Sequence, residues 1–113
     1  MPAAVTFQAK PGKEEELEQL PGDPEAGRWA AGLQGAARNT LFFARGRMIR
    51  VLEFPDDAEP PSMSDVIQQN PDFERFMRKL GSLIENGFDL DSPGSLEEFS
   101  GRITCPLIFD VRP

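Results

Sequence analysis

This chain of 113 residues is predicted to fold as α+β, with its elements in the ferredoxin-like order β-α-β-β-α-β. Three observations predict this class. Apolar and polar residues alternate near the N-terminus, two further apolar runs flank a short break at 45–47, and a long apolar stripe at helical spacing follows residue 70. A chain of this length builds one core, so we expect a single domain over residues 1–113.

The first third of the chain predicts one strand, one helix and a loop. Residues Ala3 to Lys10 alternate in polarity as a half-buried strand does. Residues Lys13 to Leu20 begin with three glutamates, which favour a helix N-terminus through the macrodipole, and Pro21 stops that helix. Residues 22–34, rich in Gly, Pro and Ala, are predicted to be a loop. Trp29 in that loop would either cover the edge of the core or stack on the ring system of a ligand.

The centre of the chain, Leu41 to Phe54, reads LFFARGRMIRVLEF and predicts two paired strands joined by a turn at Arg45-Gly46-Arg47. On the second strand, alternation points one set of side chains to one face and the other set to the opposite face: Met48, Arg50, Leu52 and Phe54 against Arg47, Ile49, Val51 and Glu53. Both faces carry apolar groups, so we expect helices on one face and a partner sheet on the other.

The C-terminal half predicts two helices and an edge strand. After an acidic, proline-rich loop at 55–64, Ser62 or Ser64 would cap a short helix that runs to residue 69. Asn70-Pro71 then begins a long amphipathic helix that ends at Asn86-Gly87. A loop at 88–100 with one helical turn leads to a final strand, 103–111, which Pro106 restricts to an edge or a bulge.

Charge is distributed unevenly along the chain. The net charge is -7, yet the stretch from Arg28 to Leu52 contains five arginines and no acid. This pattern indicates a local anion site on a protein that repels nucleic acid, so we expect no nucleic-acid partner. The alternative is that these arginines lie at the edge of the sheet and pair with nearby carboxylates.

Residue types that are missing exclude several kinds of chemistry. Without His or Tyr, and with Cys105 as the only thiol, the chain cannot build a Ser-His-Asp or Cys-His device, and we expect no metal site. Proton transfer near neutral pH falls to a carboxylate, to Cys105 or to a lysine. The N-terminus lacks the pattern of a signal peptide and no apolar run reaches membrane-spanning length, so we expect a cytoplasmic protein without a membrane partner.

Several segments together resemble the SchA/CurD-like family of aromatic polyketide and spore-pigment biosynthesis and, more distantly, the tetracenomycin-type polyketide cyclases. The matching segments are KPGKEEELEQL, FARGRMIRVLEF, QQNPDFERFMRKLGSLI and FDLDSPGSLEEF, which cover most of the chain except residues 21–37. The resemblance implies a homodimeric α/β barrel in which each protomer holds a cavity between its sheet and its helices. It also implies an aromatic polyketide intermediate as the ligand, no cofactor, and components of a type II polyketide synthase as partners.

The resemblance carries over to particular residues. Arg50 and Glu53 match an Arg and a Glu on the central strand of the family, and Asn70-Pro71 stands at its Gln-Pro. Val66 stands where relatives often have a histidine, so any acid or base must be another group. We expect Arg50 and Glu53 to be catalytic, although their spacing on one strand puts them on opposite faces unless a bulge intervenes. The candidate substrate-binding residues are Trp29, Arg38, Asn39, Phe43, Arg47, Phe73 and Met77.

Three functions follow from these expectations. The first is an enzyme, a polyketide cyclase or aromatase, in which Arg50 stabilises an enolate, Arg38 or Arg47 assists, and Glu53 moves protons. The second is a cofactor-independent monooxygenase that acts on an anthrone-like phenol through Trp29, Asn39 and Arg50. The third is a non-catalytic protein that binds a polyketide intermediate or steadies a synthase complex.

Overall fold

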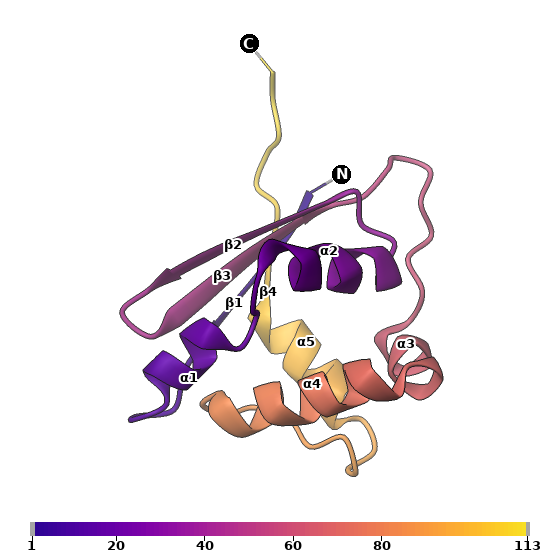
Figure 1. The fold of residues 1–113 in the computed structure, drawn as a ribbon. Helices are drawn as coiled ribbons and strands as arrows, with labels where there is room; N and C mark the ends of the chain where they lie inside the picture. The colour runs from indigo at the N-terminus through magenta and orange to yellow at the C-terminus, as the bar shows by residue number, and fades with distance from the viewer. Residues whose placement is uncertain (1, 113) are drawn as a thin grey trace.

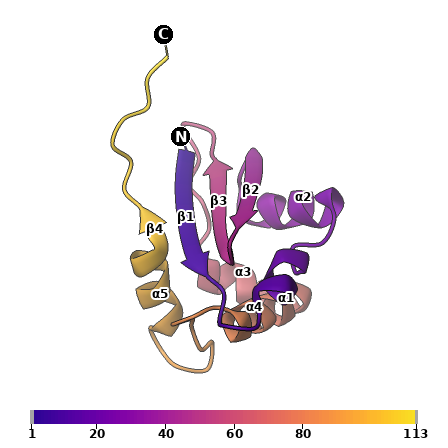
Figure 2. The same ribbon diagram turned by 90° about the vertical axis from the view of Figure 1, so that its left-hand side faces the viewer.

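The computed structural model describes residues 2–112, which form a four-stranded antiparallel sheet with helices on one face (Figure 1). The strand order is β2-β3-β1-β4, so β3 lies between the parallel strands β1 and β2, as in the ferredoxin-like pattern (Figure 2). The elements in chain order are β1 (Pro2–Gln8), α1 (Glu14–Gln19), α2 (Pro24–Leu33), β2 (Arg38–Ala44), β3 (Arg47–Glu53), α3 (Met63–Gln69), α4 (Pro71–Leu83), α5 (Ser95–Ile103) and β4 (Thr104–Cys105).

The central hairpin is confirmed. β2 and β3 pair from Ala44 opposite Arg47 to Arg38 opposite Glu53. The two residues of the turn, Arg45 and Gly46, have φ of 54° and 77°. Positive φ at both positions gives a turn whose twist matches the twist of the flanking strands. The hairpin therefore has a fixed register, which decides which side chains face the helices.

The prediction of a loop over residues 22–34 is wrong, because α2 occupies Pro24–Leu33. The start signals were present: Asp23 Oδ1 accepts a hydrogen bond from the Ala26 amide at 2.9 Å, and Pro24 lies in the first turn. Two glycines inside the helix, Gly27 and Gly32, lower its intrinsic propensity and conceal it in the sequence. Packing of the helix against β2 stabilises it in the fold.

The second crossover agrees with its prediction at both helix starts. Ser62 caps α3 by accepting a hydrogen bond from the Asp65 amide at 3.1 Å. Asn70 precedes Pro71 at the start of α4, but its side chain donates to the Val66 carbonyl at 2.8 Å rather than capping α4. α4 ends at Leu83, three residues before the predicted stop at Asn86. The apolar stripe of this helix is buried or half-buried beneath the sheet, with Phe73 only 1% exposed.

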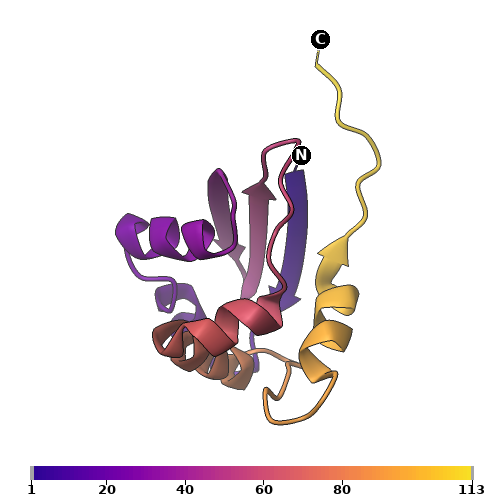
Figure 3. The same cartoon turned by 90° about the vertical axis from the view of Figure 1, so that its right-hand side faces the viewer.

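The last predicted strand, 103–111, is largely wrong. α5 extends through Ile103, and only Thr104 and Cys105 pair with β1. Pro106, which has no backbone N–H to donate, directly follows the last paired residue. The chain then leaves the sheet edge as an extended segment (Figure 3), with Leu107, Ile108, Phe109 and Val111 exposed.

The two faces of the sheet have different surroundings. One face packs against the helices around two clusters of buried apolar residues, one near Phe7 and Met48 and the other near Phe73 and Met77. On the opposite face no helix covers the sheet, and Phe42 and Ile49 are 56% and 40% exposed. This arrangement agrees with the two-faced character expected of β3. Within residues 2–112, no helix is both long and apolar enough to cross a membrane.

Candidate functional site

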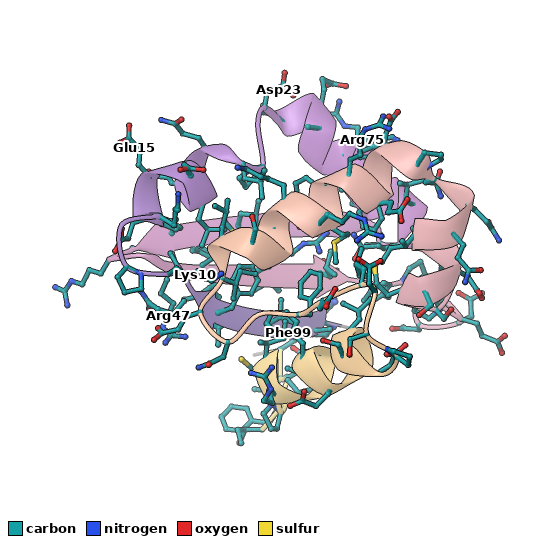
Figure 4. All side chains as sticks on the ribbon, turned by 90° about the horizontal axis from the view of Figure 1, so that it is seen from below. Lys10, Glu15, Asp23, Arg47, Arg75 and Phe99 are labelled. Carbon is teal, nitrogen blue, oxygen red and sulfur yellow. The ribbon has the colours of Figure 1, made fainter. Side chains whose placement is uncertain are left out.

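A cavity of about 410 Å³ lies between the sheet and the helix layer, within the size range of small-molecule sites. Each of the strands β1–β4 and each of the helices α1–α5 contributes lining residues, together with Pro60 and Pro61 from the loop after β3. Figure 4 views this layer from below, with α4 crossing the sheet and α5 beside it. The lining is mostly aliphatic and aromatic, and its bulky members include Trp29, Phe73, Phe76, Met77, Phe88 and Phe99. The cavity therefore suits a largely apolar ligand.

An aromatic wall forms one part of this cavity. The Trp29 ring meets the Phe73 ring edge-on, with centroids 6.0 Å apart and planes at 70°. Phe73 in turn stacks against Phe76 at 6.1 Å. Trp29 remains 44% exposed, so it belongs to the rim of the cavity rather than to its floor. A planar ligand that enters past Trp29 would contact aromatic faces of the kind that ring systems prefer.

Polar side chains are few in the cavity. Among the described lining residues, Arg50 is the only charged one. Gln34 and Asn39 are the only described lining residues with amide side chains. Ser100 and Thr104 supply hydroxyls, but the Thr104 Oγ1 donates to the Ser100 carbonyl at 2.6 Å and so serves the end of α5. The chemistry of the site therefore centres on Arg50 and the two amides.

Two amides hold the Arg50 side chain. Its Nε donates to Asn39 Oδ1 at 2.9 Å, and its Nη1 donates to Gln34 Oε1 at 3.3 Å. The amide nitrogens are used as well: Asn39 Nδ2 donates to the Gly27 carbonyl at 3.2 Å, and Gln34 Nε2 donates to the Ala30 carbonyl at 3.0 Å. The guanidinium is thus tied through neutral groups to the backbone of α2.

Among the described residues, no opposite charge lies beside the Arg50 guanidinium. Within residues 2–112, no ion pair includes Arg50, and no carboxylate lines the cavity. Burial away from water lowers the pKa of its guanidinium, although an arginine keeps its proton in proteins. The N–H groups that Asn39 and Gln34 do not engage can donate to a ligand oxygen. An enolate, phenolate or carboxylate on an aromatic ligand would complete this arrangement.

The structure brings together five of the residues expected at the site and leaves four outside the cavity. Trp29, Asn39, Arg50, Phe73 and Met77 all line it. Of the other four, three are exposed, namely Arg38, Arg47 and Glu53. The fourth, Phe43, packs against the core cluster near Phe7 and Met48.

Each exposed residue of that second set has a specific position. Arg47 donates to Thr6 Oγ1 at 3.1 Å, on the face of β3 that no helix covers. Glu53 lies on that same face, with no bulge between it and Arg50, as the alternation along the strand predicts. Arg38 lies in a second hollow of about 580 Å³ that it shares with Arg28.

Gln34 is the member of the site that sequence reasoning missed. It follows α2 directly as the C-terminal cap, is only 6% exposed, and is the one polar side chain buried to this degree among the described residues. A recognised helix at 24–33 would have drawn attention to a polar residue at its end, ahead of a glycine with φ of 74°. A loop prediction over residues 22–34 assigns Gln34 neither a face of an element nor a hydrogen-bond partner.

No group of three or more His, Cys, Asp or Glu side chains gathers within residues 2–112 in a way that could hold a metal ion. The site chemistry available from the described residues is therefore hydrogen bonding, one positive charge and apolar contact.

Comparisons with known proteins bear on the fold. No protein-family model matches the chain, and no curated protein sequence matches it. Among solved structures, the fold is similar to that of tetracenomycin F2 cyclase from Streptomyces glaucescens, a type-II polyketide cyclase. The TM-score is 0.60 at 15% identity, and the match covers 100% of this chain and 98% of that one. At this identity the likeness shows the fold alone. It agrees with the expected resemblance to tetracenomycin-type cyclases, whereas membership of the SchA/CurD-like family stays an expectation.

Proposed function

We propose that the protein is a polyketide cyclase that acts on an aromatic or poly-β-ketone intermediate held in the cavity beneath the sheet. The observation that carries the proposal is Arg50, a half-buried cation without a carboxylate partner among the described residues, in a cavity whose lining is otherwise largely apolar. Holding an unpaired charge partly away from water costs stability, so its presence is best explained by a ligand that supplies the opposite charge. The shared fold with a type-II polyketide cyclase supports the same reaction class.

The reaction step that suits this site is an intramolecular aldol closure. An enolate carbon of the substrate forms a bond to one of its own carbonyl carbons, the new alkoxide takes up a proton, and loss of water makes the ring aromatic. Arg50 would donate to the oxygen on which negative charge develops, which is the role that a preorganised donor fills best. The aromatic wall near Trp29 and Phe73 would hold the chain folded, and holding reactive carbons together lowers the barrier substantially.

Proton transfer in this scheme does not come from an acid or base on the cavity wall. No Asp, Glu, Lys or Cys is among the described residues that line the cavity. We therefore propose that the substrate ionises with solvent as the proton acceptor, and that Arg50 makes this ionisation easier by stabilising the anion. Glu53, which faces away, takes no part in this scheme.

The proposal includes a homodimer. The sheet face that exposes Phe42 and Ile49, together with the exposed apolar residues that follow β4, gives one chain a large apolar surface that water disfavours. A second copy pressing its own sheet on this face would cover both surfaces. Sedimentation analysis would test this: we expect a dimer, and a shift toward monomer in Phe42→Asp.

Product analysis tests the activity. The protein would be incubated with a minimal polyketide synthase, and products of wild type, Arg50→Met and Arg75→Met would be compared by mass spectrometry. Arg75→Met is the matched control because it also removes one positive charge, from an exposed position on the outer side of α4 (Figure 4). We expect a new cyclised product, lower in mass by the water lost, with wild type and with Arg75→Met but not with Arg50→Met.

Other results would redirect the proposal. A product heavier by oxygen, formed only under air, would make the protein a cofactor-independent monooxygenase. An unchanged product spectrum across several chain lengths would argue against an enzyme and leave a polyketide-binding role.

A further inference from the structure

Gln34 has a fixed orientation that can be worked out from its two partners. The Ala30 carbonyl can only accept a hydrogen bond, and the Arg50 guanidinium can only donate. The amide nitrogen of Gln34 must therefore face Ala30, at 3.0 Å, and its oxygen must face Arg50 Nη1, at 3.3 Å. With the side chain 6% exposed, water has little access to compete for either bond.

Asn39 repeats this arrangement on the other side of Arg50. Its nitrogen donates to the Gly27 carbonyl and its oxygen accepts from Arg50 Nε at 2.9 Å. Gly27 and Ala30 lie three residues apart on α2, so both amides anchor the guanidinium to successive parts of one helix. Each amide supplies an oxygen without a negative charge.

A carboxylate would fit at either place with almost no change in shape. Glutamate at 34 would place an anionic oxygen near 3.3 Å from Nη1, within salt-bridge distance, and would neutralise Arg50 in a part of the molecule where charges interact strongly. It would also lose the bond to the Ala30 carbonyl. Neutral amides at both positions leave the positive charge of Arg50 unused by the protein.

We propose that Gln34 is a positioning residue that holds Arg50 by a neutral contact, so that the ionised oxygen of an aromatic ligand becomes the only counter-charge in the cavity. The inference rests on the proposed function for the kind of ligand, a polycyclic phenol or enol. It goes further because it states that the ligand binds in its ionised form, and it assigns to Gln34 the preference of the cavity for that form over the neutral one. Arg50 is the only charged side chain among the described residues that line the cavity, so no other group there competes for this role.

Alizarin, a dihydroxyanthraquinone whose visible spectrum changes when its phenol ionises, is a suitable probe, and its dimethyl ether is the control that cannot ionise. Trp29 reports binding of either compound, because it lines the cavity and is the only tryptophan of a chain without tyrosine. Titrations across a pH series would give the affinity from Trp29 fluorescence and the pKa of the bound probe from its absorbance. The proteins compared are wild type, Gln34→Glu and Gln34→Met.

For wild type we expect the pKa of bound alizarin to lie about 1–3 units below that of free alizarin, the effect of a nearby opposite charge. In Gln34→Glu this lowering should disappear, while the dimethyl ether binds as it does to wild type. Gln34→Met, which adds no charge, should keep most of the lowering and lose affinity through poorer positioning of Arg50. A purely structural role for Gln34 would instead weaken both probes alike and leave the bound pKa unchanged.

Asn39→Asp keeps the test decisive if Gln34→Glu fails to fold, because it introduces the same charge 2.9 Å from Arg50 Nε. The inference is overturned if wild type does not lower the pKa of bound alizarin, or if a folded carboxylate variant lowers it as wild type does. These outcomes are separate from the product assay. Cyclised product without a lowered pKa of bound alizarin would support the proposed function and reject this inference. A lowered pKa of bound alizarin without cyclised product would support this inference and reject the proposed function.

Discussion

Replacing Arg50 with methionine should remove activity without removing stability. Methionine retains the unbranched stem of the side chain and deletes the charge. The guanidinium makes two hydrogen bonds, to Asn39 and Gln34, and a bond to a charged group contributes about 1.5–3 kcal/mol. The substitution also removes the cost of holding a cation partly away from water, and this cost reaches several kcal/mol per ion when burial is complete.

These two contributions have similar size and opposite sign. In the variant, deletion of the guanidinium leaves space between the cavity and the two amide oxygens, and water that enters this space can replace the lost hydrogen bonds. We therefore expect the free energy of unfolding to change by about 1 kcal/mol or less. Activity should fall about 10²–10³-fold, as it does when one donor to a developing oxyanion is removed.

The assay is urea unfolding followed by far-ultraviolet circular dichroism, with product formation measured on the same preparations. Arg75→Met serves again as the charge-matched control, since its ion pair with Asp72 is exposed. A buried cation with a structural role behaves differently: breaking its pairing costs about 3–5 kcal/mol. A loss of that size in Arg50→Met, at an unchanged denaturant slope, would show that Arg50 holds the fold together and would refute the reasoning above.

Three further predictions concern other parts of the molecule. Gly81→Ala should lower the melting temperature, at a cost of about 1–3 kcal/mol from overpacking, because the added Cβ would lie 2.9 Å from the Phe88 carbonyl oxygen; a rise would mean that helix propensity outweighs this contact. Arg45→Asn should raise the melting temperature by relieving part of the roughly 1–2 kcal/mol that a left-handed residue costs, and an unchanged value would argue against strain in the turn. The midpoint of the pH–rate profile should shift to higher pH in Arg50→Met. The Arg50 cation lowers the pKa of the substrate, so its removal raises that pKa; a profile that keeps its wild-type midpoint would contradict this role.

The sequence predicted the hairpin and the orientation of Arg50 because both depend on local rules. Alternation along one strand decides that Arg50 and Glu53 face opposite sides, and the Arg45-Gly46 turn fixes the register. The start of α4 at Asn70-Pro71 was equally local. What could not be predicted was the partnership of Arg50 with residues 11 and 16 positions away, since that depends on how α2 packs on the sheet.

The strand predicted over residues 103–111 is largely wrong for a related reason. Apolar residues after Pro106 satisfy a strand pattern, but a strand also needs a neighbour with free hydrogen-bonding groups. Among residues 103–111, only Thr104 and Cys105 pair with another strand, β1. The sequence correctly predicts the apolar character of the segment, but its large apolar side chains stay exposed and no described part of the chain covers them.

The part of the chain with the weakest pattern carries most of the site. α2 supplies Trp29 at the rim, the Gly27 and Ala30 carbonyls that orient the two amides, and Gln34 at its end. The sheet and α4 provide much of the apolar lining of the cavity. α2 anchors the neutral amides that hold Arg50, and so it leaves the positive charge of Arg50 available in the cavity. Proteins that share this fold can therefore differ in the ligand they accept by changes confined to the first crossover. An acid at position 34, directly after α2, would place a negative charge beside Arg50 and would convert the anion-binding cavity that we propose into a neutral one without altering the frame.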